Sequence, residues 1–108
     1  MTGEALVVLC TIDDESAAVS LAKTLIEEQN AACVNLVPNI RSFYRWEGAT
    51  HEDNELLLVI KTTQGAYAAL EARITALHPY DVPEIIALPV SQGVPSYLSW
   101  LTGSVTPS

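Results

Sequence analysis

Residues 78–84, HPYDVPE, hold the densest group of side chains able to do chemistry: an imidazole, a phenol and two carboxylates. Two more such groups are the thiol of Cys10 and the carboxylate of Glu55. A thiolate, an imidazole and a carboxylate that meet can share a divalent ion, and these mixed donors suit copper or zinc better than magnesium or calcium. No two of these residues have the spacing of a CxxC or HxH motif, so a metal site would depend on the fold.

Each of these side chains also has an ordinary structural interpretation. A histidine that precedes a proline at a helix end, as His78 does, commonly interacts with the helix dipole. Cys10 stands in an apolar run, where a free cysteine packs as a small apolar side chain. Glu84 can pair with a backbone N–H group or with Lys61, and Glu55 can simply be solvated. The residue types alone leave these alternatives open.

The sequence lacks the common motifs of nucleotide binding and nucleophilic catalysis. Its five glycines form no GxGxxG or P-loop pattern, and no GxSxG motif is present. Asp81 and Glu84 could be read as paired acids, but nothing near them in the sequence marks them as more than solvated loop carboxylates. We therefore expect no enzymatic activity and no organic cofactor.

Composition and charge narrow the class of protein further. The 108 residues, 49% hydrophobic and 17% charged, predict a single globular domain over 1–108. A net charge of −8 with five basic residues argues against binding to nucleic acid or to an anionic membrane surface. The apolar run 5–10 is too short for a signal peptide or a membrane span, and Cys10 and Cys33 suggest reduced thiols. We therefore expect a cytoplasmic protein.

The elements that must position these residues follow from apolar periodicity. Strands are predicted over residues 5–12, 32–48, 54–63 and 83–90, and helices over 13–30, 64–78 and 95–101. Pro38 interrupts the second strand and predicts a bulge or an edge position there, whereas Pro79 ends the second helix. The segment ATHED, residues 49–53, is predicted to be the turn between the two central strands.

This order predicts an α+β fold of the ferredoxin-like βαββαβ type with a short C-terminal helix. Right-handed crossovers place both main helices on one face of a sheet with strand order 4-1-3-2. The end of the first strand then lies beside the starts of the third and fourth. Cys10, Glu55 and residues 78–84 should therefore gather at one end of the sheet.

Three of the predicted strands, LVVLC, LLLVI and IIALPV, are apolar at both odd and even positions. Both faces of the sheet therefore require burial, although two helices cover only one. We infer that a second copy of the chain covers the other face, which makes the protein a homo-oligomer.

The predicted hairpin carries aromatic residues on both of its sides. Phe43, Arg45 and Glu47 point to one side, and Tyr44 and Trp46 point to the other. A protruding hairpin of this kind needs cover, and a neighbouring subunit would supply it. A platform on which a ligand stacks is the alternative.

Taken in order, several segments resemble the CutA divalent-cation tolerance family over roughly residues 6–101. They are VVLCT, AACVNLVP, FYRWEG, LVIKTT, the HPY-x-x-PE pattern, LPV and YLSWL. The resemblance implies a cytoplasmic, non-enzymatic homotrimer of ferredoxin-like subunits that is similar in architecture to the PII signalling proteins. It also implies that the long hairpin reaches to neighbouring subunits.

The same resemblance implies an association with copper and other divalent cations, zinc among them. The positions linked to copper in the family match Cys10, Glu55 and His78. Some copper-binding members have a second histidine directly before the matching one, where this chain has Leu77. An alternative that the resemblance allows is a PII-like signalling module with a small ligand between subunits. Its cleft would be lined by Trp46, Lys61, Tyr80 and Glu84.

Overall fold

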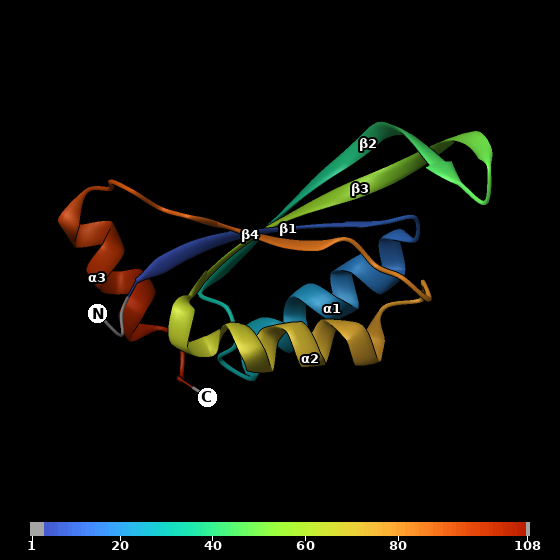
Figure 1. The fold of residues 1–108 in the computed structure, drawn as a ribbon. Helices are drawn as coiled ribbons and strands as arrows, with labels where there is room; N and C mark the ends of the chain where they lie inside the picture. Colours follow the sequence, from blue (N-terminus) through green and yellow to red (C-terminus); the bar gives the residue numbers. More distant parts are fainter. Residues whose placement is uncertain (1–3, 108) are drawn as a thin grey trace.

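The computed structural model describes residues 4–107. Four strands and three α-helices follow one another in the order β-α-β-β-α-β-α, with a short 3₁₀ helix before α2 (Figure 1). The elements are β1 (Ala5–Ile12), α1 (Glu15–Glu27), β2 (Cys33–Trp46), β3 (Ala49–Thr63), η1 (Gln64–Ala66), α2 (Tyr67–Leu77), β4 (Ile85–Pro89) and α3 (Pro95–Gly103).

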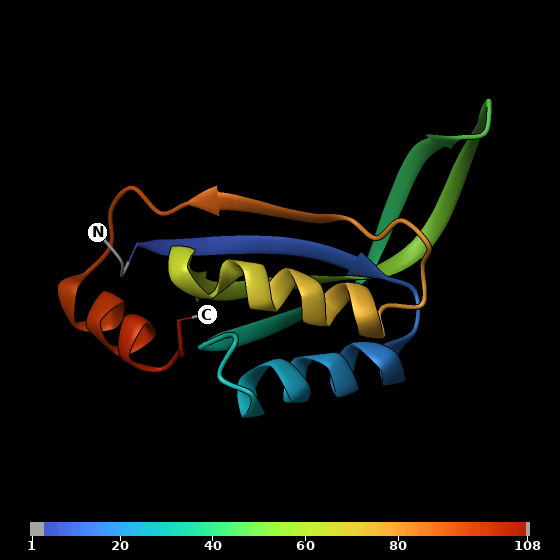
Figure 2. The same cartoon turned by 60° about the horizontal axis from the view of Figure 1, so that its bottom comes forward.

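The four strands form one antiparallel sheet in the order β2-β3-β1-β4, which reads 4-1-3-2 from the opposite edge. Helices α1 and α2 lie side by side on one face of this sheet, and α3 lies at one end of it (Figures 1 and 2). The predicted α+β class is therefore confirmed.

The hairpin between β2 and β3 differs from the prediction. Residues 49–53 are not the turn, since they form the first part of β3 and pair with the end of β2. The turn consists of Glu47 and Gly48, whose φ angles of 50° and 81° are both positive. Two positive φ angles give a tight two-residue turn that continues the strand twist, and a Glu-Gly pair is a weaker sequence signal for it than Asn-Gly.

Pro38 has the predicted effect on β2. The register between β2 and β3 shifts between Val37 and Ile40, and Asn39 has a φ angle of 61°. A proline cannot donate a hydrogen bond to a neighbouring strand, so the ladder breaks there. Beyond this bulge the hairpin rises away from the sheet (Figure 2).

Local hydrogen bonds explain where α1 begins and where α2 ends. The carboxylate of Asp14 caps α1 by accepting a hydrogen bond from the backbone N–H of Ala17 at 3.0 Å. Helix α2 ends at Leu77, and the backbone N–H of His78 makes the last bond, to the carbonyl of Ile74 at 2.8 Å. Pro79 has no N–H group with which to extend the helix.

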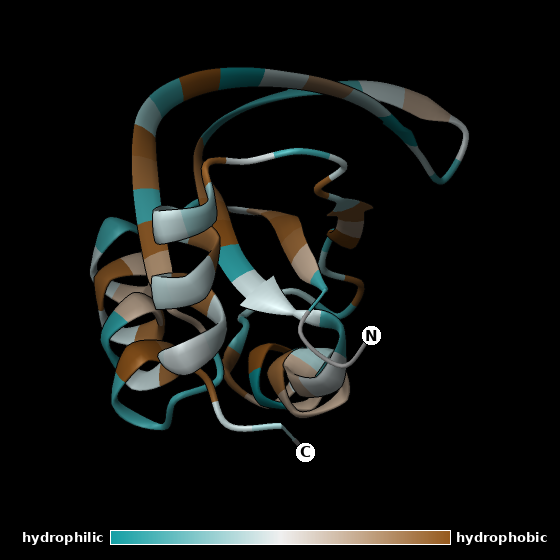
Figure 3. Ribbon diagram, turned by 90° about the vertical axis from the view of Figure 1, so that its left-hand side faces the viewer, coloured by the Kyte–Doolittle hydropathy of each residue, from teal (hydrophilic) through white to brown (hydrophobic). Residues whose placement is uncertain are grey.

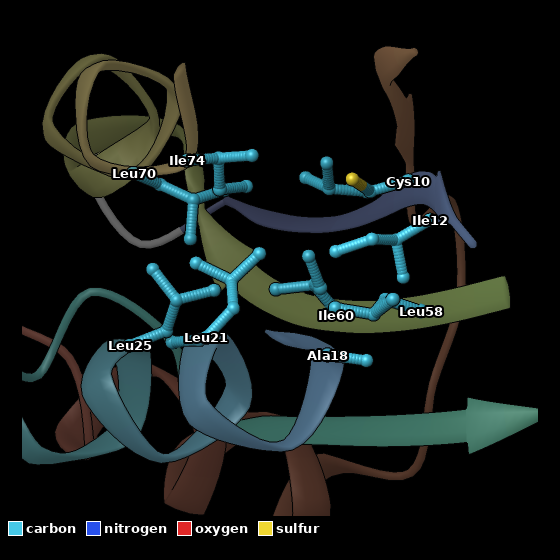
Figure 4. Close-up of a cluster of buried hydrophobic side chains, with 11 residues drawn as sticks. Cys10, Ile12, Ala18, Leu21, Leu25, Leu58, Ile60, Leu70 and Ile74 are labelled. Atoms are coloured by element: carbon cyan, nitrogen blue, oxygen red, sulfur yellow. The ribbon is translucent and has the colours of Figure 1, made fainter. Parts of the chain in front are cut away.

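The hydrophobic core lies between the sheet and these two helices. Leu21 and Leu25 of α1 meet Leu70 and Ile74 of α2 over the buried strand residues (Figure 4). The strands contribute Val8, Cys10, Ile12, Leu58 and Ile60. Since side chains alternate along a strand, every second residue of β1 and β3 faces this core.

The opposite face of the sheet is also apolar. It carries the alternate strand side chains, which are Val7, Leu9, Leu57, Val59, Ile86 and Leu88. Ile86 and Leu88 are 51% and 50% exposed, respectively. Figure 3 shows hydrophobic residues distributed along the strands of the sheet. We call this set of residues the open face, because neither α1 nor α2 covers it.

Candidate functional site

Three segments meet at one end of the sheet: the end of β1, the base of the β2–β3 hairpin and the loop between α2 and β4 (Figures 1 and 2). Two hydrogen bonds join them. One runs from the α2–β4 loop to Glu55 of β3, and the other runs from His78 to the backbone of Thr11. The topology therefore brings these distant parts of the sequence together.

The imidazole of His78 is fully occupied within the chain. Its Nε2 atom lies 2.8 Å from the carbonyl oxygen of Thr11, and its Nδ1 atom accepts a hydrogen bond from the backbone N–H of Tyr80 at 3.1 Å. A carbonyl oxygen can only accept and a backbone N–H can only donate, so in this arrangement Nε2 is the donor and Nδ1 is the acceptor. The ring is 7% exposed and packs edge-on to Tyr80 with centroids 4.6 Å apart. Through its contact with Thr11, His78 connects the α2–β4 loop to β1.

Tyr80 connects this loop to β3. Its hydroxyl donates a hydrogen bond to Oε2 of Glu55 at 2.7 Å, and Glu55 is itself 7% exposed. Burial, this hydrogen bond and the negative charge of Glu55 raise the pKa of Tyr80 far above the ordinary value of a phenol. Tyr80 therefore remains a hydrogen-bond donor to Glu55 at any physiological pH.

Cys10 is completely buried in the core, beside Ile12 and Leu58 (Figure 4). Burial, followed by the negative charges of Glu84 and Glu55, raises the pKa of its thiol from 9.0 to about 12. The thiol is therefore protonated at neutral pH and is a poor metal ligand in this state.

The three predicted metal ligands do not form a ready-made site in the single chain. Among residues 4–107, no group of three or more His, Cys, Asp and Glu side chains is arranged to hold a metal ion. Cys10 faces the core, and both ring nitrogens of His78 already have partners. Of the three, Glu55 lines an open cavity, and Cys10 and His78 are absent from the lining of that cavity.

That cavity is a cleft of about 680 Å³ between the hairpin, the end of β1 and the α2–β4 loop. Its walls carry five carboxylates, from Asp13, Asp53, Glu55, Asp81 and Glu84. They also carry four aromatic rings, from Phe43, Tyr44, Trp46 and Tyr80. Thr11, Ser42 and Val82 complete the lining. We call this cavity the acidic cleft.

Three of the four residues expected in a ligand cleft line the acidic cleft, namely Trp46, Tyr80 and Glu84. The fourth, Lys61, is not among the lining residues. It lies on the open face opposite Val7, and its ammonium group donates a hydrogen bond to the side chain of Asn35. The predicted strand order itself places the end of the third strand, and with it Lys61, at the end of the sheet opposite to Glu55, as the register confirms.

Sequence reasoning missed Asp13 and Asp53 as members of the site and considered Tyr44 only as part of a possible platform for ligand stacking. The hydroxyl of Tyr44 donates a short hydrogen bond to Asp53, and this bond is the main cause that raises the pKa of Tyr44. Alternation along the hairpin could have paired these two residues only if the turn had been placed at Glu47 and Gly48. The position of the turn was therefore the missing signal.

A family model described as "CutA1 divalent ion tolerance protein" matches residues 6–104 of the chain. The chain belongs to the CutA1 divalent ion tolerance family. The match confirms the resemblance noted in the sequence. The family model and the protein of Thermus thermophilus both have names that refer to tolerance of divalent ions and to no enzymatic activity.

Individual relatives agree with this assignment. The divalent-cation tolerance protein CutA of Thermus thermophilus is 55% identical, over 88% of this chain and 92% of its own length. The chloroplastic protein CutA of Arabidopsis thaliana is 46% identical over 95% of this chain, which spans 57% of that longer protein. The crystal structure of CutA1 from Oryza sativa matches with a TM-score of 0.95 at 46% identity, covering 99% of this chain and 98% of that one.

Within residues 4–107, no helix has the length and apolar character needed to cross a membrane.

Proposed function

We propose that this CutA1 family member is a cytoplasmic, non-enzymatic homotrimer that binds divalent cations, copper first and zinc next. The proposed binding of divalent cations rests on the positions of Glu55 and Glu84. Both carboxylates line the acidic cleft, and the negative charges of both contribute, after burial, to the raised pKa of the Cys10 thiol. The family name, which refers to divalent ions, supports the same class of ligand.

Glu55 and Glu84 are the residues best placed to receive a cation from solvent. A divalent cation between them would neutralise the two charges that disfavour ionisation of Cys10. The thiol could then lose its proton, and its sulfur, which suits copper and zinc, could become a ligand only after the Cys10 side chain has turned from the core toward the cleft. His78 could join only after one of its ring nitrogens has left Thr11 or Tyr80. Binding should therefore release protons.

Isothermal titration of the assembled protein with Cu²⁺ and with Zn²⁺ tests this site. We expect the double variant Cys10→Ala, His78→Ala to lose at least tenfold in copper affinity. Cys33→Ala is the matched control, because Cys33 is the second free thiol and lies outside the acidic cleft. An unchanged affinity in the double variant would show that the metal site is elsewhere.

The open face supports self-association. Complete burial of one large aliphatic side chain contributes about 1.5–3 kcal/mol, so Ile86 and Leu88, each half exposed, would together add about 2 kcal/mol per subunit. Phe43 and Trp46 on the hairpin are 63% and 48% exposed and offer further apolar area. These surfaces support the trimer that the family resemblance implies.

Sedimentation velocity at several concentrations tests the oligomeric state. We expect one species with the mass of three chains, and we expect Leu88→Lys to lower the mass by placing a charge on the open face. Val19→Lys is the control, since Val19 is 36% exposed and belongs to α1, which packs on the other face of the sheet. A monomeric wild-type protein at micromolar concentration would refute the trimer.

A second candidate function is a PII-like signalling module with a small ligand between subunits. The size of the acidic cleft and its lining by Trp46, Tyr80 and Glu84 favour it. Lys61 would have to enter the same site from a neighbouring subunit. A rise in melting temperature on addition of a metabolite, with no metal present, would support this function. Stabilisation by metal ions alone would argue against it.

A further inference from the structure

We propose that the middle of the α2–β4 loop, residues 79–83, is a hinged wall of the acidic cleft, held closed by a latch made of the side chains of His78 and Tyr80. We call residues 79–83 the latched segment. The inference rests on the proposed function in one respect, since the open state is the one in which His78 could become a metal ligand. The latch itself is a property of the metal-free chain.

The latched segment lacks the bonds that hold most of the chain in place. Within residues 4–107, no backbone-to-backbone hydrogen bond involves residues 79–83. The segment belongs to no helix or strand, and Asp81 and Val82 are exposed. Segments with few buried contacts and few backbone hydrogen bonds open locally at a low cost in free energy. Opening of this segment would therefore leave the sheet and the helices intact.

Three hydrogen bonds close the segment, and all of them pass through the side chains of His78 and Tyr80. The ring of His78 bonds to the carbonyl of Thr11 at 2.8 Å and to the backbone N–H of Tyr80 at 3.1 Å. The hydroxyl of Tyr80 donates to Glu55 at 2.7 Å. The two rings also pack edge-on with centroids 4.6 Å apart, so the release of one ring disturbs the other. The three bonds therefore act as one latch.

The backbone on either side of the segment defines the hinge points. The N–H of His78 is bonded to the last turn of α2 at 2.8 Å, and Ile85, the first residue of β4, pairs with Cys10. Between these points, Pro79 and Pro83 each fix one φ angle. His78 is extended, with φ and ψ of −74° and 138°, as a residue before proline prefers. A segment with so little internal freedom moves as a unit.

Movement of the latched segment changes the acidic cleft, because Tyr80, Asp81 and Val82 belong to its lining. The bond from Tyr80 to Glu55 joins this wall to β3. A closed latch therefore keeps the two walls together and keeps both ring nitrogens of His78 engaged. The closed state has no ready-made metal site among residues 4–107, whereas an open latch frees His78 and removes the phenolic donor from Glu55.

The latch therefore lowers the apparent affinity for a metal ion that needs His78. Where only the open state binds, the apparent affinity is reduced to the fraction of molecules that are open. Loss of a hydrogen bond to a charged group changes an equilibrium by about tenfold or more. Removing the hydroxyl of Tyr80 should thus raise the open fraction about tenfold. A merely structural role for Tyr80 predicts the opposite, an unchanged or lower metal affinity in its absence.

Amide hydrogen exchange at residue 80, followed by NMR in the metal-free assembled protein, measures the latch. This amide donates to Nδ1 of His78, so it exchanges when the latch opens. We expect Tyr80→Phe to raise its exchange rate about tenfold. Val82→Ala is the matched control, because Val82 lies in the same segment and is 68% exposed.

Three results of this experiment would overturn the proposal. One is an equal exchange rate at residue 80 in the wild-type protein and in Tyr80→Phe. Another is an equal rise in Val82→Ala, which would show that any change in the segment has the same effect. The third is an equal rise for the amides of β1 in Tyr80→Phe, which would show global destabilisation and not the opening of a latch.

Stopped-flow mixing with Cu²⁺ tests the role of the latch in metal binding. The emission of Trp46, which lines the cleft, reports binding in a Trp100→Phe background. If opening precedes binding, the observed rate reaches a plateau as the copper concentration increases, and Tyr80→Phe should raise that plateau severalfold. A rate that rises linearly with copper in both proteins would overturn the control of binding by the latch.

The two measurements separate this inference from the proposed function. Exchange is recorded without metal, so unchanged exchange in Tyr80→Phe would overturn the latch even if copper binds in the acidic cleft. An absence of copper binding would instead overturn the divalent-cation function and the role of the latch in it. Exchange at residue 80 would still decide whether the latch exists.

Discussion

Replacing Tyr80 by phenylalanine removes one hydroxyl group and with it the hydrogen bond to Glu55. The ring of residue 80 can stay in its edge-on contact with His78, so packing changes little. What remains is a carboxylate that is 7% exposed and has lost its side-chain donor. Hydrogen bonds to charged groups contribute about 1.5–3 kcal/mol. The cleft side of Glu55 is open to water, so we expect the lower end, a loss of about 1.5 kcal/mol in the free energy of unfolding.

Urea unfolding at a fixed protomer concentration measures this loss, since the stability of an oligomer depends on concentration. Tyr97→Phe is the matched control, because Tyr97 on α3 also contacts another ring, that of Trp100, but makes no hydrogen bond through its hydroxyl within residues 4–107. A double-mutant cycle with Glu55→Gln should give a coupling energy of about 1 kcal/mol. If Tyr80→Phe destabilised the protein no more than Tyr97→Phe, the proposed link between the α2–β4 loop and β3 would be wrong.

Four further predictions follow, of which two concern the thiol, one concerns the turn and one concerns the hairpin. In a Cys33→Ser background, Cys10 should resist alkylation at pH 8 until urea unfolds the protein, and rapid labelling of the native state would contradict its burial. Because its pKa rises from 9.0 to about 12 on folding, the free energy of unfolding should fall as pH rises from about 9 toward 12, and Cys10→Ala should reduce that fall. Gly48→Ala should lower the free energy of unfolding, measured with urea, by about 1 kcal/mol, because its φ of 81° is unfavourable for a residue with a Cβ. An added Cβ meets no atom within 4 Å, so no clash adds to this cost. An unchanged free energy of unfolding would refute the turn geometry. Trp46→Ala should lower the sedimentation mass at low concentration while changing copper affinity less than about threefold, and an intact trimer in this variant would count against the role of the hairpin in assembly.

Much of the fold followed from local signals in the sequence. The apolar runs located all four strands, Pro79 marked the end of α2, and Pro38 marked the bulge in β2. The turn of the hairpin was misplaced because its conformation depends on positive φ angles at Glu47 and Gly48. The polar segment that follows has turn-like composition although it forms part of β3. A strand exposed on a protruding hairpin lacks the apolar alternation that identifies other strands.

The candidate site was less accessible to prediction. Strand order brought residues 78–84 to the same end of the sheet as Glu55, and the bond between Tyr80 and Glu55 agrees with that inference. The partners of His78 could not be foreseen, because the carbonyl of Thr11 is 67 residues away in sequence and any backbone carbonyl could have served. Trp46, Tyr80 and Glu84 were expected in a ligand cleft, but its acidic character was missed because its carboxylates come from several elements and share no spacing. Burial of Cys10 follows from the pleat of β1, which turns every second side chain into the core.

The most direct test of the metal proposal is a crystal structure of the assembled protein grown with Cu²⁺, with data recorded at the copper absorption edge. The account predicts an anomalous peak in the acidic cleft, beside the carboxylates of Glu55 and Glu84 and within reach of Cys10. A peak held by other residues, or copper saturation in solution with no peak in the cleft, would contradict it.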